Sequence, residues 1–219
     1  MKRVTLFCGH YGSGKSNLAV NYALFLRSLG KAVSLADMDI VNPYFRSADS
    51  KAELEAAGVT VVSLPFARSN VDLPALPSEL YGLVQRRDLF AVLDVGGDDR
   101  VALALGRYVP YLKAENDCDM LFVVNFRRPL TQTAEDAFAV LKEIELAAGL
   151  GFTGLVNNTN LGAETTAETV ESSVAEMQKL SVLAGLPVVM TSFDRRLGAL
   201  PVPSPFPMAL QKNDPAMGE

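Results

Sequence analysis

Residues 8–16 read Cys-Gly-His-Tyr-Gly-Ser-Gly-Lys-Ser, and this short stretch decides the fold. From Gly9 to Ser16 it follows the pattern Gly-x-x-x-x-Gly-Lys-Ser, the Walker A pattern of a phosphate-binding loop. A run typical of a β-strand over 4–8 precedes the loop, and apolar residues at helical spacing follow it from Leu18 onward. Phosphate-binding loops occur in this strand–loop–helix context, so we expect a nucleotide site here.

Each residue type in the loop has a physical task. Glycines let backbone N–H groups approach phosphate oxygens at the positive end of the following helix. We expect Lys15 to bind the β- and γ-phosphates and the Ser16 hydroxyl to ligate Mg²⁺. A glycine-rich turn that only precedes a helix is the alternative interpretation. The predicted nucleotide-binding residues of the loop are Gly9, Gly12, Ser13, Gly14, Lys15, Ser16 and Asn17.

Carboxylates end two of the predicted strands. Asp37 and Asp39 come at the end of the second strand, and Asp94 closes the fourth, two residues before Gly96. Ligands bind at the carboxyl edge of such a sheet. We expect one carboxylate of the first pair to hold a metal-bound water and the other to orient the attacking water or accept a proton. Asp94 is predicted to contact Mg²⁺ through water, and Gly96 to offer an N–H to the γ-phosphate. Alternatively, the strand-end aspartates only cap the segments that follow.

Short β-type runs alternate with amphipathic helical segments along the chain, which predicts an α/β fold. Repeated βαβ units give a doubly wound, mostly parallel sheet with helices on both faces. We expect one domain over 1–199 and a proline-rich, extended or disordered tail over 200–219. The predicted strands are 4–8, 32–37, 59–64, 90–94, 120–125, 153–157 and 187–191, and further long helices are predicted over 131–148 and 165–184.

Composition excludes several functional classes. The 219 residues include two cysteines, too few for a disulfide framework, and one histidine, which leaves little material for a His/Cys metal site or a Ser-His-Asp triad. A net charge of −5 argues against a nucleic-acid partner. The sequence has no apolar run long enough to span a membrane, and its basic opening is too short for a secretory signal. We therefore expect a cytoplasmic protein without membrane contact.

The predicted base site and the nucleotide follow from the late strand. Asn157 and Asn158 end it with amides, which can read a base edge because an amide both donates and accepts hydrogen bonds. The chain has no Asn-Lys-x-Asp signature for guanine. We therefore predict ATP with Mg²⁺ in preference to GTP.

These motifs, in this order, resemble the SIMIBI class of P-loop NTPases, in particular the ParA/MinD/CobQ-CobB group. The resemblance covers about residues 3–193, and its narrower part, a bacterial branch of ParA-like ATP-binding proteins, rests on "GHYGSGK", "DIVNPYFR", "DVGGDD", "ALGRY" and "VNNTNLG". It implies that Asp39 positions the hydrolytic water, that Asp37 lies near Mg²⁺ and that Asn158 contacts the adenine. The residues then predicted to act in catalysis are Lys15, Asp39 and Asp37, and those at the metal are Ser16, Asp39 and Asp94.

One residue departs from that group. ParA and MinD proteins usually carry a lysine at the position of His10, which crosses a dimer interface to the partner's phosphates. A neutral imidazole has a shorter reach than lysine and no fixed charge. The sequence therefore leaves two alternatives, a homodimer that forms with ATP and a protein that does not dimerise in this way. His10 is either an exposed loop residue or a phosphate contact. Arg46 is either a surface residue or a transition-state cation, and Arg127 with Arg128 is a candidate for binding an anionic substrate or a partner.

Three functions remain open from the sequence. The first is a slow ATPase that acts as a nucleotide-controlled switch for a protein partner. The second is a kinase or ligase of the dethiobiotin-synthetase or CobQ type, which uses ATP on a small acidic metabolite. The third is an ATPase of metal or iron–sulfur maturation, against which the absence of a Cys-x-x-Cys pair counts.

Overall fold

The computed structural model describes residues 1–38, 50–63, 82–83, 85–96, 109–110, 112 and 117–210. One sheet of eight parallel strands runs through them in the order β3-β2-β4-β1-β5-β6-β7-β8. The predicted doubly wound α/β fold is confirmed. The strands are β1 (Val4–Cys8), β2 (Val33–Asp37), β3 (Val59–Ser63), β4 (Phe90–Asp94), β5 (Cys118–Val124), β6 (Gly154–Asn157), β7 (Val188–Asp194) and β8 (Pro205–Met208).

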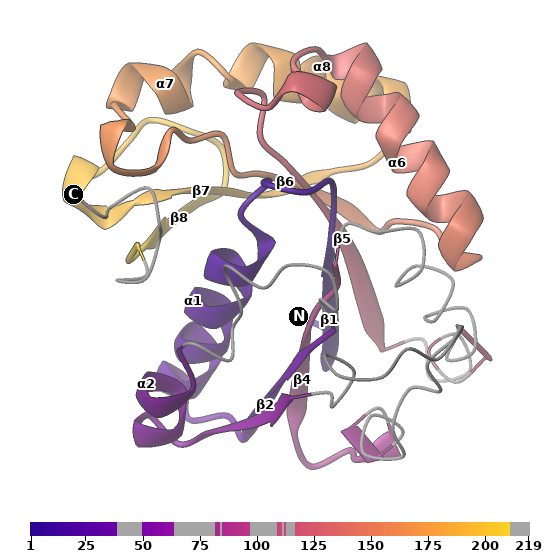
Figure 1. The fold of residues 1–219 in the computed structure, drawn as a ribbon, viewed down its shortest axis with the longest axis vertical. Helices are drawn as coiled ribbons and strands as arrows, with labels where there is room; N and C mark the ends of the chain where they lie inside the picture. Colours follow the sequence, from indigo (N-terminus) through magenta and orange to yellow (C-terminus); the bar gives the residue numbers. More distant parts are fainter. Residues whose placement is uncertain are drawn as a thin grey trace, which may run out of the picture.

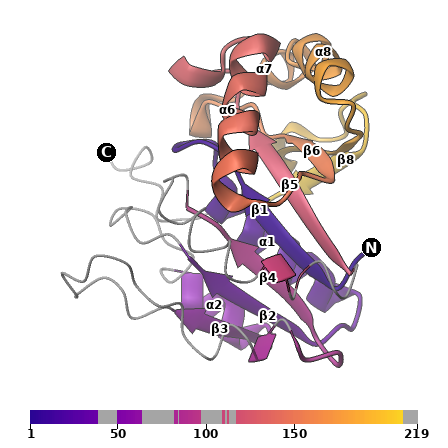
Figure 2. The same cartoon turned by 90° about the vertical axis from the view of Figure 1, so that its right-hand side faces the viewer.

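Helices cover both faces of this sheet (Figures 1 and 2). On one face, α1 (Lys15–Ser28) and α2 (Lys51–Ala56) bury side chains such as Leu18, Leu26 and Leu54 against the strands. On the other, α6 (Ala134–Ala148) and α8 (Val174–Ala184) bury Leu141 and Leu180. Because successive residues of a strand point to opposite faces, β-strands that are apolar throughout serve both cores.

The predicted helix over 165–184 is two helices. A capping box in which Thr166 and Thr169 bond reciprocally starts α7 (Ala167–Glu171), and α8 begins only after Ser172 and Ser173. The hydroxyl of Ser173 donates to the carbonyl oxygen of Val170 at 2.6 Å, a local bond that competes with regular helix geometry. A short 3-10 turn, η3 (Pro129–Thr131), precedes α6, η4 (Gly162–Glu164) follows β6, and η5 (Arg195–Leu197) follows β7.

Part of the proline-rich segment belongs to the sheet. Residues 205–208 are extended, as one of the two alternatives predicted, and they form β8 at the edge beside β7. Proline lacks a backbone N–H, and an edge strand tolerates this because one side of it faces no partner strand. Residues 211–219 lie outside the described residues.

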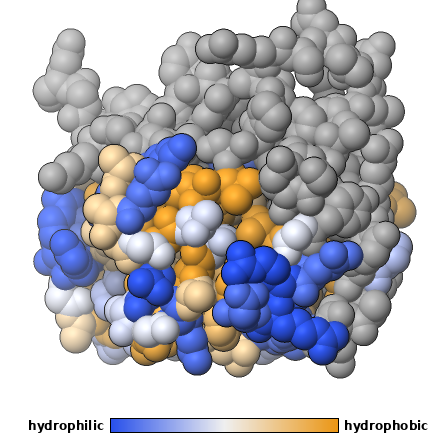
Figure 3. Space-filling model, turned by 90° about the horizontal axis from the view of Figure 1, so that it is seen from below, coloured by the Kyte–Doolittle hydropathy of each residue, from blue (hydrophilic) through white to orange (hydrophobic). Residues whose placement is uncertain are grey.

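The lower end of the molecule has a mixed surface (Figure 3). Apolar side chains gather in the middle of its described part, and hydrophilic side chains surround them.

Candidate functional site

The glycine loop between β1 and α1 is closed against two other strands. Gly9 has a φ of +158°, and a Cβ there would lie 2.3 Å from the carbonyl oxygen of Val123 in β5. Gly14 has a φ of +83°, and a Cβ there would lie 2.4 Å from Nδ2 of Asn158, just past β6. Only glycine fits either position without displacing a neighbour, so the glycines of the motif also serve packing.

The loop curls around its own carbonyl groups. The carbonyl oxygen of His10 accepts a hydrogen bond from the backbone N–H of Ser13 at 3.2 Å and from Nζ of Lys15 at 3.1 Å. The helix starts directly, because the N–H of Leu18 donates to the carbonyl oxygen of Gly14 at 3.1 Å. This geometry holds the Lys15 ammonium over the loop, at the positive end of α1.

His10 turns toward its own loop. Its Nδ1 lies 3.0 Å from the carbonyl oxygen of Tyr11, which can only accept a hydrogen bond. The Tyr11 side chain itself is exposed. Of the two predicted roles for His10, this contact favours the loop residue.

Two predicted carboxylates meet at the carboxyl edge of the sheet. Asp37 in β2 and Asp94 in β4 are register partners, and both are buried, Asp94 completely. Burial raises the pKa of the Cys8 thiol at the end of β1. The positive charge of Lys15 lowers this pKa and the negative charge of Asp94 raises it, so both charged groups lie near the end of β1. Asp37, Asp94 and Ser16 offer the carboxylate and hydroxyl oxygens that Mg²⁺ prefers, and these residue types fit that ion.

Other predicted residues are only partly placed. Asp39 and Arg46 lie outside the described residues, so their roles stay predictions. Gly96 is buried two residues after β4. Within the described ranges, no group of three or more His, Cys, Asp or Glu side chains could hold a metal ion.

Asn158 braces the loop. Its side chain is 1% exposed; Nδ2 donates to the carbonyl oxygen of Ser13 at 2.6 Å, and Oδ1 accepts from the Ser192 hydroxyl at 2.6 Å. The amide therefore joins the phosphate loop to β7. The sequence indicated Asn158 as a base contact, which stays a prediction, but it gave no sign of this bracing role or of Ser192.

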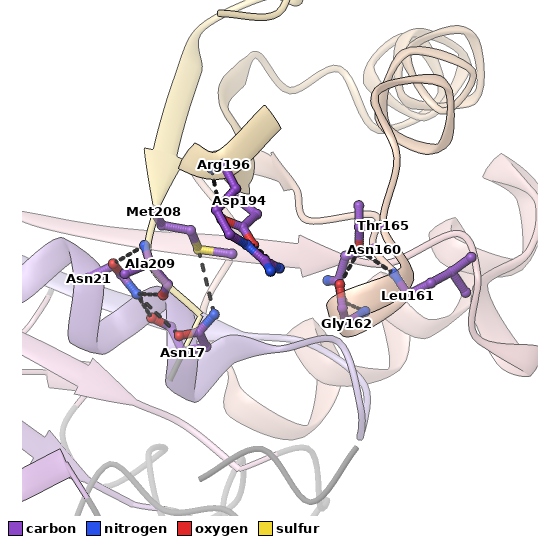
Figure 4. Close-up of polar contacts among 10 residues, drawn as sticks. All are labelled: Asn17, Asn21, Asn160, Leu161, Gly162, Thr165, Asp194, Arg196, Met208 and Ala209. Atoms are coloured by element: carbon purple, nitrogen blue, oxygen red, sulfur yellow. Dashed lines mark hydrogen bonds and ion pairs between the residues drawn. The ribbon is translucent and has the colours of Figure 1, made fainter. Parts of the chain in front are cut away.

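Asn17 points toward β8 rather than into the loop. Its Nδ2 lies 3.9 Å from the sulfur of Met208, and the next turn of α1 carries Asn21, which exchanges two hydrogen bonds with the backbone of Ala209 (Figure 4). Those bonds measure 2.8 and 2.9 Å. The edge strand is thus tied to the helix that follows the phosphate loop. Asn17 still lies in the first turn of α1, where we predicted a nucleotide contact.

The two adjacent arginines after β5 diverge. Nε of Arg128 donates to the carbonyl oxygen of Gly12 at 2.9 Å, while Arg127 reaches Ser172 at 3.4 Å. Arg128 therefore lies on the phosphate loop and Arg127 on the α7 side. The sequence treated the pair as one candidate, because it cannot show which side chain turns toward the loop.

Asp194 is a buried carboxylate at the carboxyl edge of the sheet that the sequence analysis did not name. The predicted strand over 187–191 ended early, whereas β7 continues to Asp194 at the carboxyl edge of the sheet. The carboxylate is 5% exposed and is bound by Arg196. Burial acts to raise the pKa of Asp194, but hydrogen bonds from Arg196 outweigh it and hold this pKa below its usual value. An aspartate at the end of a strand was the available signal.

Several solved structures are similar to this fold. Similar structures are FtsY from Thermotoga maritima (TM-score 0.62, 18% identity), the signal recognition particle receptor FtsY from Elizabethkingia anophelis in complex with GDP (0.56, 20%), and the signal recognition particle 54 kDa protein from Aeropyrum pernix in complex with GDP (0.53, 17%). They match 89%, 90% and 85% of this chain. This likeness shows that the chain shares the fold of these FtsY and 54 kDa proteins.

The similarity covers only part of each of those proteins. The chain spans less than two thirds of those proteins, namely 62%, 59% and 40% of their lengths. Comparisons of the sequence with protein families and with curated proteins gave no match. The narrower ParA/MinD resemblance has no support among these structures.

The prediction of ATP in preference to GTP is wrong by the same comparison. Two of the structures named above, FtsY from Elizabethkingia anophelis and the 54 kDa protein from Aeropyrum pernix, are complexes with GDP. The prediction depended on one missing signature, and its absence excludes only one of the ways in which side chains can read guanine. None of the described helices combines the length and apolar character that crossing a membrane requires.

Proposed function

We propose that this chain binds a guanine nucleotide with Mg²⁺ at the loop after β1 and hydrolyses GTP slowly, as a switch for a protein partner. The observation that carries this proposal is the closed glycine loop, with Lys15 held over it and Asp37 and Asp94 paired at the adjoining strand ends. The GDP-containing neighbours support the choice of nucleotide.

The chain's own residues have distinct tasks in this proposal. The loop N–H groups and the Lys15 ammonium bind phosphate oxygens, which requires Lys15 to give up the carbonyl oxygen of His10. Ser16 and Asp94 hold Mg²⁺, directly or through water, and the ion neutralises charge that develops on the phosphates. Asp39 remains the residue predicted to orient the attacking water, and Asp37 lies beside the metal.

Nucleotide binding tests the site directly. We expect the purified wild-type protein to bind a fluorescent GDP analogue in the presence of Mg²⁺ and to prefer it to the matching ADP analogue. Lys15→Ala should weaken binding by about 100-fold, because charged hydrogen bonds to phosphate contribute roughly 1.5–3 kcal/mol each. Lys179→Ala is the matched control, because that lysine is exposed and pairs with Glu176 on α8, away from the loop.

Turnover distinguishes the switch from a metabolic enzyme. Slow phosphate release from GTP that a captured partner protein accelerates supports the switch. Release that requires a small acidic metabolite would instead identify a kinase or ligase. Wild-type protein that binds no guanine nucleotide, or Lys15→Ala protein that binds it as tightly as wild type, would overturn the proposal.

A further inference from the structure

Asp194 and Arg196 form a charged pair that the phosphate site does not use. Oδ1 of Asp194 accepts the backbone N–H of Arg196 at 2.9 Å, and Oδ2 accepts Nε and Nη2 at 2.5 Å each. The Asp194 side chain is 5% exposed and that of Arg196 is 61% exposed. The guanidinium therefore covers the carboxylate on its solvent side.

Two chains of contacts connect this carboxylate to the phosphate loop. Asp194 pairs with Met208 across β7 and β8, and Met208 contacts Asn17 in the first turn of α1. On the same strand, Ser192 donates to Asn158, which holds the loop carbonyl. The carboxylate thus stands at the same edge of the sheet as the phosphate site and close to it, where the rest of a nucleotide would extend.

The segment from Asn160 to Thr165, which has its own hydrogen bonds, lies on the other side of the pair in Figure 4. The N–H of Leu161 donates to the hydroxyl of Thr165 at 2.9 Å, and the N–H of Gly162 donates to Oδ1 of Asn160 at 3.1 Å. Figure 4 shows the Asp194 and Arg196 side chains between this segment and the group formed by Asn17 and Met208.

The chemistry of a carboxylate selects among purines. Ionised, it only accepts hydrogen bonds, and guanine presents two neighbouring donors, the N1–H and the 2-amino group, on its Watson–Crick edge. Adenine presents an acceptor at N1, which a carboxylate repels. Building on the proposed function, we propose that Asp194 is the residue that reads guanine, and that Arg196 competes with the base for its carboxylate.

Replacing the carboxylate of Asp194 with an amide tests this assignment. In Asp194→Asn the amide keeps one acceptor and gains a donor, a pattern that suits the N1–H and 2-oxo group of xanthine. We expect GDP affinity to fall roughly 10- to 100-fold and xanthosine diphosphate affinity to rise above it, because charged hydrogen bonds are exchanged for a mismatch. Arg196→Ala should retain the preference for guanine. Asp88→Asn is the control, since the Asp88 carboxylate also binds an arginine two positions away, Arg86, but at an exposed site before β4.

Wild-type protein provides a measurement that needs no variant. Inosine diphosphate lacks only the 2-amino group, so we expect it to bind about tenfold more weakly than GDP. Equal affinity for both, or unchanged guanine selectivity in folded Asp194→Asn, would overturn the assignment while GDP binding itself stands. Absence of GDP binding in the wild type would overturn the proposed function, and this inference with it.

Discussion

Gly14→Ala would combine backbone strain with displacement of the Asn158 amide that braces the phosphate loop. A Cβ at Gly14 needs a φ of +83° and would meet Nδ2 of Asn158 at 2.4 Å. The amide cannot yield freely, because Ser13 and Ser192 hold its two ends. We expect a cost of about 3–8 kcal/mol, combining roughly 1–2 for the left-handed backbone with about 1–3 for each of the two buried hydrogen bonds.

Gly185→Ala is the matched control for this prediction. Gly185 has a φ of +66° at the end of α8, and nothing lies within 4 Å of a Cβ there. Its substitution should cost only the backbone part, about 1–2 kcal/mol. With a urea m-value of about 2 kcal/mol/M, Gly14→Ala would lower the unfolding midpoint by roughly 1.5–4 M and Gly185→Ala by about 0.5–1 M.

A double-mutant cycle completes the test. In an Asn158→Ala background the nearest atom of the clash is gone, so Gly14→Ala should then cost no more than Gly185→Ala. The measured quantity is the free energy of unfolding in urea of each single and double variant. Equal losses for Gly14→Ala with and without Asn158 would refute the reasoning, because the clash would then have no energetic consequence.

Three further measurements follow from the described contacts. Arg128→Ala should weaken GDP binding about tenfold, since its bond fixes the loop, and Arg127→Ala should leave it unchanged; calorimetry compares the two. Burial raises the pKa of Cys118 to about 12, so this thiol should stay almost unreactive at pH 8 until urea unfolds the protein, and rapid labelling of native protein would contradict this. Asn21→Ala loses two bonds to Ala209 and should lower unfolding free energy by about 1–3 kcal/mol, with an unchanged urea midpoint as the contrary result.

The sequence predicted the phosphate loop well because its constraints are local. Glycines at fixed spacing, a lysine and a hydroxyl between a strand and a helix leave few alternatives, and neighbours along the chain determine their geometry. The paired strand ends that carry Asp37 and Asp94 could be predicted for a similar reason, since parallel βαβ units bring successive carboxyl ends to one edge.

The braces around the loop could not be predicted in the same way. The bond from Asn158 to Ser13 joins residues 145 positions apart, and that from Arg128 to Gly12 spans 116. Side-chain direction at a strand end depends on where the strand stops, and predicted boundaries err by a few residues. Because the predicted strand stopped at residue 191, Asp194 was not recognised as a strand-end residue. The prolines of β8 argued against a strand, although an edge strand needs few of its own N–H groups.

The braces also indicate where the two nucleotide states can differ. The carbonyl oxygens of Gly12 and Ser13 accept hydrogen bonds from Arg128 and Asn158, which follow β5 and β6, so the loop would lose little freedom on binding a phosphate. The described contact that phosphate must replace is the bond from Lys15 to His10. GDP and GTP share that exchange. Besides a contact from Lys15 to the γ-phosphate, discrimination between them would arise at the ends of β2 and β4, where carboxylates and Mg²⁺ would meet that phosphate.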